Sequence, residues 1–215
     1  MFPLDLYNYF EIAAVLICLI CWFKLKKTNL KWIIPYLLFI VIVELTGRYI
    51  GRELKGPIGW IFNISVPIEY LFFSFLYYIN YKSEVYKKIS FGFIVCFTLF
   101  VLVYSIVKSI ENFHPIYLKI GSITMIIFSC FYLAEILRIG TIINPLKIPM
   151  FWIACGLLLF NAGEFISNFL MDFLFKNKAN WGKMFRLVNN NLIVVLYSCI
   201  SIAIIIASWA HREKD

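Results

Sequence analysis

Seven long apolar segments, separated by short polar connections, constrain this chain more than any other feature of its sequence. They cover about residues 7–23, 32–50, 60–81, 89–107, 117–137, 150–171 and 187–209. A helix needs about 20 mainly apolar residues to cross a bilayer, and helices satisfy their own backbone hydrogen bonds in lipid. The segments are too long and too uniform for the alternating strands of a β-barrel. The sequence therefore predicts an all-α, polytopic membrane helical bundle with seven transmembrane helices.

The amino-acid composition supports this assignment and predicts a single domain. Hydrophobic residues make up 62% of the 215 residues and charged residues 15%, whereas soluble domains are about 45–50% apolar and about 25% charged. A soluble core of this size could not hide the excess apolar surface. We therefore expect one transmembrane domain over residues 1–215, with the lipid bilayer as its first partner.

The net charge of +8 is explained by membrane insertion and not by nucleic acid. Lysine and arginine lie mainly between the apolar segments, where headgroups and the positive-inside bias favour them. The first connection is the strongest basic cluster, with Lys24, Lys26, Lys27 and Lys31. It favours an N-terminus outside and a C-terminus in the cytoplasm. Abundant Ile, Phe, Lys and Asn are typical of an AT-rich bacterial gene, and hence indicate an inner (cytoplasmic) membrane.

The sequence contains no catalytic or metal-binding signature. All six cysteines fall inside apolar segments and both histidines fall outside them, so no zinc site or Cys/His couple is predicted. The last segment carries no lysine that could hold retinal. We expect no cofactor and no metal. We favour the absence of enzyme activity over its presence. Catalysis in which Glu44, Glu69 and Glu164 alone act as acid and base is kept as an alternative.

Polar side chains within the apolar segments form the most informative pattern. Depths estimated from a helical rise of about 1.5 Å per residue place them in one half of the membrane. Such groups cannot face lipid and mark a function or a structural contact. The sequence thus predicts a cavity open to one side. Its candidate ligand-binding residues are Glu44, Arg48, Asn63, Glu69, Asn161, Glu164, Asn168 and Asn190.

We assign these residues different roles. Glu69 and Glu164 lack an obvious partner in their own segments and are expected to bind a cation or carry protons. Glu44 and Arg48 share a helix face at i,i+4 and are expected to pair. The asparagines either orient a ligand or hold helices together. Glu11 is predicted to be a solvated end residue.

Three further residues are predicted to shape the helix packing. Gly47 and Gly51 form a GxxxG pair, which allows close approach of another helix of the chain or of a second subunit. Pro67 removes a backbone donor two residues before Glu69 and should kink its helix. Near the opposite face, Glu135 is predicted to lie in the headgroup region.

The order of polar groups also indicates an internal repeat. Glu44 and Arg48 end the second segment, much as Asn161, Glu164 and Asn168 end the sixth. Two parallel three-helix repeats joined by a linker helix would explain this, an arrangement that resembles the sugar-facilitator (SWEET) type of transporter. The resemblance covers helix count and polar pattern only. Coincidence explains the pattern equally well.

Three functions are consistent with the sequence. The first is a small-solute transporter or ligand-binding membrane receptor, with a small polar or cationic ligand in the cavity. The second is an effector or channel-forming subunit that a partner activates and that forms a homo-oligomer. The third is an assembly factor that binds another membrane protein.

Overall fold

All regular structure in the described part of the chain is helical. The computed structural model describes residues 5–108, 112–138, 144–174 and 181–210, and their side chains except at 168–186 and 210. The elements are α1 (Leu6–Ile20), α2 (Trp22–Leu25), the 3-10 turn η1 (Asn29–Trp32), α3 (Ile33–Arg52), α4 (Gly59–Asn80), α5 (Glu84–Val107), α6 (Ile116–Arg138), the 3-10 turn η2 (Pro145–Lys147), α7 (Pro149–Leu174) and α8 (Trp181–Ala210).

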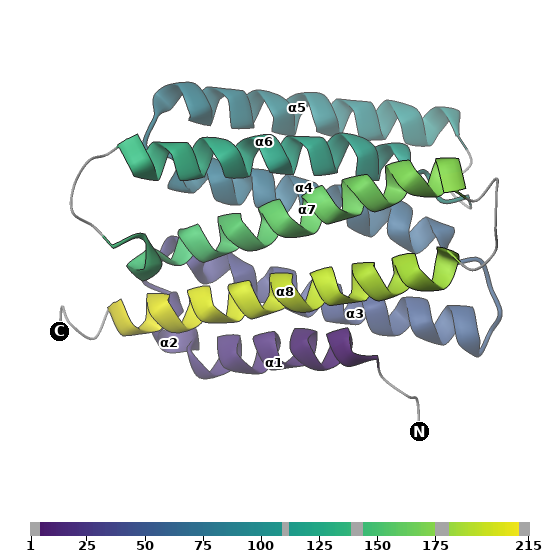
Figure 1. Ribbon diagram of the computed structural model, residues 1–215, viewed down its shortest axis with the longest axis horizontal. Helices are drawn as coiled ribbons and strands as arrows, with labels where there is room; N and C mark the ends of the chain where they lie inside the picture. Colours follow the sequence, from purple (N-terminus) through teal and green to yellow (C-terminus); the bar gives the residue numbers. More distant parts are fainter. Residues whose placement is uncertain (1–4, 109–111, 139–143, 175–180, 211–215) are drawn as a thin grey trace.

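The long helices lie side by side along one axis, and successive helices run in opposite directions (Figure 1). Helices α1, α4, α6 and α8 run one way, and α3, α5 and α7 run the other way. The starts of α1, α4, α6 and α8 and the ends of α3, α5 and α7 therefore share one end of the bundle, which we call the α1-start end. The end of α8 lies at the opposite, α8-end face.

Six helical segments in the described residues are long and apolar enough to cross a membrane. They are Asn29–Arg52, Gly59–Asn80, Glu84–Val107, Ile116–Arg138, Pro149–Ser167 and Leu187–Trp209. The chain is thus an apolar helical bundle with the character of an integral membrane protein, as predicted. The seven-helix count and the repeats stay predictions.

The first apolar segment forms a shorter helix than the sequence predicts. Helix α1 has 15 residues, which span about 22 Å at the usual helical rise, and the bilayer core is about 30 Å thick. The helix ends at Cys21, and the single turn α2 follows it. The sequence predicted one continuous helix up to residue 23, whereas the helix ends earlier although the apolar run continues.

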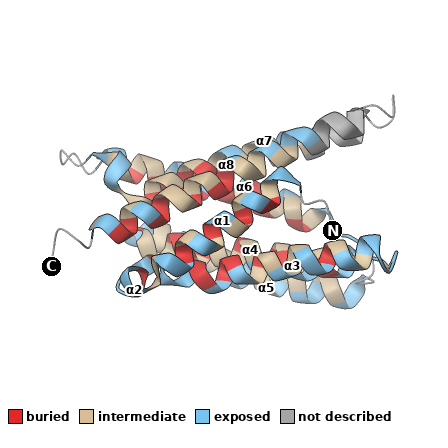
Figure 2. Ribbon diagram, turned by 90° about the horizontal axis from the view of Figure 1, so that it is seen from below, coloured by how far each residue is buried: buried red, intermediate tan, exposed pale blue. Residues whose placement is uncertain are grey.

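The apolar core runs the length of the bundle, and Figure 2 shows buried positions, in red, distributed along helices such as α8 and α3. Helix α5 is the peripheral member, because only Ser90 and Phe97 of its residues are buried. Leu102 and Ile106 on α5 are exposed, as expected for a surface that faces lipid. The remaining long helices therefore surround the interior.

Small residues and hydroxyl pairs set the register between the inner helices. Gly156 and Gly163 of α7 face side chains of α8, since a β-carbon at either residue would collide with Cys199 or Leu192. Between α4 and α6, the hydroxyl of Tyr70 lies 3.0 Å from Oγ of Ser122. Seven residues further along both helices, Tyr77 and Ser129 make the same contact at 2.6 Å. These contacts fix α4 against α6.

Gly47 and Gly51 of α3 lie against α4 and the α3–α4 connection. A β-carbon at Gly47 would stand 3.9 Å from the ring of Phe62, and one at Gly51 would stand 3.3 Å from Ile58. The two glycines thus face their own chain. Pro67 is buried inside α4, where it leaves the carbonyl of Asn63 without its usual intrahelical donor.

Candidate functional site

A cavity of about 600 Å³ lies between the helices at the α1-start end of the bundle. Residues of the α3–α4 and α5–α6 connections form part of its wall, so it lies near the surface at that end. Its lining residues come from α1, α3, α4, α6, α7, α8 and the two connections: Glu11, Ile40, Val43, Glu44, Pro57, Ile58, Gly59, Phe62, Ser65, Val66, Glu69, Tyr70, Asn112, Phe113, Leu118, Phe160, Glu164, Asn189, Ile193, Leu196 and Tyr197.

Four glutamates from four different helices line this cavity. Glu11 comes from α1, Glu44 from α3, Glu69 from α4 and Glu164 from α7. Glu69 lies within electrostatic range of the other three. No lysine, arginine or histidine is among the described residues of the lining. The described lining of the cavity is therefore acidic, and Arg48, which lies outside the lining, is within electrostatic range of Glu44 and Glu11.

Neighbouring hydroxyl groups hold the carboxylate of Glu164. Its Oε2 accepts a hydrogen bond from Ser122 Oγ at 3.2 Å and one from the Tyr70 hydroxyl at 3.4 Å. Tyr70 and Ser122 also contact each other, so the three side chains tie α4, α6 and α7 together. One carboxylate oxygen of Glu164 is thus held in place by two hydroxyl groups.

Glu11 belongs to the cavity, and its prediction as a solvated end residue was wrong. Its side chain is only 4% exposed, and its Oε2 accepts a hydrogen bond from Asn8 Nδ2 at 3.2 Å. Asn8 also accepts from the backbone N–H of Asp5. Helix α1 packs against α3 and α8, which turns Glu11 inward instead of toward the headgroups.

Arg48 does not pair with Glu44 and does not line the cavity. Its Nη2 lies 2.7 Å from Oδ2 of Asp5 and 2.6 Å from the Tyr7 hydroxyl. The arginine thus ties the start of α1 to the end of α3. The predicted direct contact between Glu44 and Arg48 is not formed, because the guanidinium reaches Asp5, 43 positions earlier in the sequence, although Glu44 and Arg48 stay within electrostatic range of each other. Glu44 faces the cavity.

The predicted asparagines have different surroundings. Asn63 is buried, donates to the carbonyl of Asn112 at 2.7 Å and accepts from the N–H of His114 at 2.9 Å, so it anchors the α5–α6 connection beside the cavity. Asn161 is buried and donates to the carbonyl of Leu157 in its own helix. Neither residue lines the cavity.

The run of asparagines near the start of α8 contributes one side chain to the cavity. Asn189 is a lining residue, whereas its neighbour Asn190, the predicted candidate, is half-buried outside the lining. The side chain of Asn168 lies outside the described residues. A helix turns by 100° per residue, so depth alone could not select the correct asparagine.

Glu135, at the α8-end face, is a buried structural acid, and its position at headgroup depth stays a prediction. It is 8% exposed. Its carboxylate accepts hydrogen bonds from the backbone N–H of Lys82, at 3.1 Å, and of Ser83. These donors precede the first turn of α5 and would otherwise lack partners. The acid therefore holds the α4–α5 connection against α6.

Among the described residues, no three His, Cys, Asp or Glu side chains converge as they would to hold a metal ion. The four glutamates instead line a space large enough for a small organic molecule. Comparison with protein families, curated proteins and solved structures found no match to this chain. The fold and the cavity define a helical membrane-type bundle with an acidic interior cavity, and its chemistry must be argued from the cavity itself.

Proposed function

We propose that this chain is an integral membrane protein that binds a small organic cation in the glutamate-lined cavity. The observation that carries the proposal is that Glu11, Glu44, Glu69 and Glu164, from four different helices, all line one cavity. Charged groups within a membrane protein are costly unless they are paired. A bound cation supplies an opposite charge, which none of the described lining residues carries.

The size and walls of the cavity favour an ammonium-type cation over a metal ion. Its volume of about 600 Å³ falls within the range of roughly 300–1,000 Å³ that is typical of small-molecule sites. The aromatic residues Phe62, Tyr70, Phe113, Phe160 and Tyr197 contribute to its wall. Aromatic faces attract organic ammonium groups through cation–π interactions, whereas a hard metal ion requires convergent oxygen ligands.

Each acid has a distinct part in the proposed binding step. Glu164, positioned by Tyr70 and Ser122, and Glu69 contact the cation directly. Glu11 and Glu44 add negative potential that draws cations into the cavity. A transporter and a receptor share this step, and both are consistent with a site in a bacterial inner membrane.

Isothermal titration of the purified full-length protein in detergent tests the proposal, with tetramethylammonium as probe and neutral tert-butanol as its isostere. We expect the cation to bind and the alcohol not to bind. Glu69→Gln and Glu164→Gln should each weaken binding by about tenfold or more, equivalent to about 1.4 kcal/mol. Glu53→Gln is the matched control, because Glu53 is exposed and does not line the cavity.

Two results would overturn the proposal. One is the absence of tetramethylammonium binding by a folded protein with a cooperative thermal transition. The other is binding that all three glutamine variants weaken equally, which would indicate a general effect of charge instead of a site.

The cavity favours this reading over an oligomeric effector or an assembly factor. The predicted oligomer seam contains Gly47 and Gly51, which face Phe62 and Ile58 of their own chain. The seam therefore gives a homo-oligomer no specific support.

A further inference from the structure

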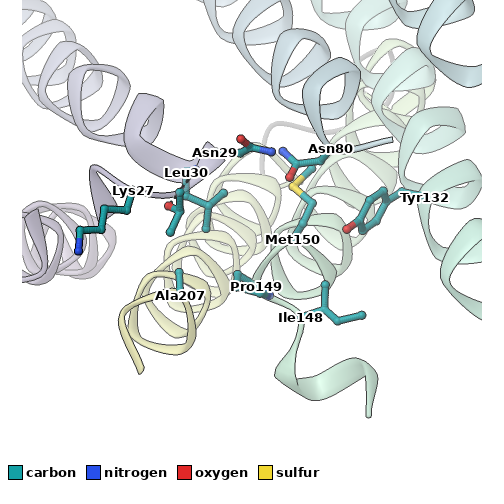
Figure 3. A pocket seen from close by; sticks show the side chains of 10 residues that line it. Lys27, Asn29, Leu30, Asn80, Tyr132, Ile148, Pro149, Met150 and Ala207 are labelled. Carbon is teal, nitrogen blue, oxygen red and sulfur yellow. Dashed lines mark hydrogen bonds between the residues drawn. The ribbon is translucent and has the colours of Figure 1, made fainter. Parts of the chain in front are cut away.

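A second cavity of about 340 Å³ lies at the α8-end face of the same bundle. Figure 3 shows the side chains of Asn29 and Asn80 close together above Met150, while the amine of Lys27 points away from them. Thr28 and Tyr132 add further uncharged polar groups to the lining, and no acid lines it among the described residues. The described lining residues thus include four acids in the first cavity and none in the second.

Four helices line both cavities. On α4 the two linings include Tyr70 and Asn80, on α7 Phe160 and Met150, and on α8 Tyr197 and Ala207. Each of these pairs is separated by ten residues, or about 15 Å of helix. Helix α6 contributes Leu118 to the first cavity and Tyr132 to the second. The two cavities therefore lie in succession along one axis of the bundle.

A closed layer of packed apolar side chains separates the cavities. On each shared helix it is formed by residues between the two linings, all at most 2% exposed. We define the closed layer as Phe73, Leu76, Met125, Ile153, Leu157, Ile200 and Ala203. All seven belong to the continuous apolar core. In this conformation, the layer blocks passage from one cavity to the other.

We propose that the two cavities are the two mouths of one transport route, and that the closed layer opens toward the second cavity after a cation has bound in the first. The identity of the solute as a small organic cation rests on the proposed function. A receptor needs only the first cavity. A second cavity built from the same four helices is what a transporter requires.

The charge difference between the cavities gives the route a binding end and a release end. Four glutamates stabilise a cation in the first cavity, whereas amide, hydroxyl and phenol groups offer weaker contacts in the second. Packed layers of side chains tend to adopt discrete arrangements and do not deform continuously. Opening of the layer is therefore expected as a two-state rearrangement of the helices.

Cysteine accessibility tests the route without knowledge of the natural solute. Ile193, Ile200 and Ala207 lie at intervals of seven on α8, in the first cavity, the closed layer and the second cavity respectively. Each is changed to cysteine in a full-length protein whose six native cysteines are replaced by serine or alanine. Oriented proteoliposomes are then treated from one face or the other with a membrane-impermeant methanethiosulfonate.

We expect Ile193→Cys to react from the α1-start face, Ala207→Cys from the α8-end face and Ile200→Cys from both faces. Reaction of Ile200→Cys from neither face, or from one face only, would overturn the route, because the layer would then be a permanent wall. The Ile193→Cys and Ala207→Cys variants show that reagent reaches each cavity.

A transport measurement in a background with native cysteines provides the second test. Ala207→Trp should place an indole in the second cavity and lower the initial uptake of radiolabelled tetramethylammonium by about tenfold, while its Kd changes less than about twofold. Ile205→Trp is the matched control, since Ile205 is on the exposed side of α8. Cation binding without uptake by the unmodified protein would overturn the route but leave the proposed function intact. Loss of binding in the glutamate variants concerns the proposed function alone.

Discussion

Gly121 lies directly against the ring of Tyr70, so that a β-carbon at residue 121 would overlap the ring atoms. The hydroxyl of the same ring contacts Ser122 at 3.0 Å and Glu164 at 3.4 Å. The absence of a side chain on α6 thus lets a tyrosine of α4 reach a cavity acid on α7. One small residue connects the packing of three helices to the geometry of the proposed site.

Gly121→Ala should therefore destabilise the protein and disturb Glu164. Overpacking of a dense core usually costs about 1–3 kcal/mol, and Tyr70 cannot move without loosening its two hydrogen-bond partners. Thermal unfolding in detergent and tetramethylammonium titration should both report the change. Gly92→Ala is the control, because a β-carbon at Gly92 of α5 would meet no atom within 4 Å. Equal melting temperatures for the two variants would contradict the close packing.

Glu135→Gln should lower stability without affecting cation binding. Hydrogen bonds to a charged group contribute about 1.5–3 kcal/mol, and the neutral amide keeps only one acceptor oxygen for the N–H groups of Lys82 and Ser83. Urea or thermal unfolding measures the loss. Glu84→Gln serves for comparison, because Glu84 is 73% exposed and pairs with Lys87 only at the surface, where such pairs contribute little. If Glu135→Gln weakened tetramethylammonium binding and Glu84→Gln did not, Glu135 would instead take part in cation binding.

The Tyr77–Ser129 hydrogen bond should show energetic coupling in a double-mutant cycle. Tyr77→Phe and Ser129→Ala each remove one partner of a fully buried contact of 2.6 Å. Because either single change leaves the other hydroxyl unpaired, the double variant should be more stable than the sum of the two losses predicts. We expect a coupling of about 0.6–1.7 kcal/mol, as for other hydrogen bonds within membranes. Strict additivity of the three unfolding free energies would exclude the bond.

The α8-end face should lie in the cytoplasm. It carries a large excess of cations over acids among the described residues, with Lys24, Lys26, Lys27, Lys31, Lys82, Lys87, Lys88, Arg138 and Lys147 against Glu84 and Glu135, and basic loops stay inside. In bacterial cells that express the cysteine-free protein, Lys55→Cys should react with an impermeant maleimide. Lys27→Cys should react only after permeabilisation. The reverse labelling pattern would show the opposite orientation in the membrane, with the glutamate cavity on the cytoplasmic side.

The long helices were predictable because a chain that crosses lipid must satisfy its own backbone hydrogen bonds. A run of apolar residues long enough to cross a bilayer has few alternatives to a helix, and the six long segments follow that rule. The same rule brought Glu44, Glu69 and Glu164 to a common depth, and the structure places all three on one cavity. Their role in binding stays a prediction.

The misassigned residues depend on contacts between segments, which depth does not specify. Arg48 pairs with Asp5 across 43 residues, and nothing in the spacing within α3 indicates that partner. Glu11 is turned inward by the packing of α1 on α3 and α8. Asn189 rather than Asn190 lines the cavity because of the rotation of α8. Sequence periodicity near helix ends was too weak to determine these orientations.

The cavity combines two kinds of structure with different tolerance to change. Its acids stand on packed helices, whereas Pro57, Ile58, Asn112 and Phe113 belong to connections between them. Connections accept substitutions and insertions more readily than packed helices do. Substitutions among these rim residues can therefore change the size and shape of the cavity mouth while the carboxylates on the helices keep their positions.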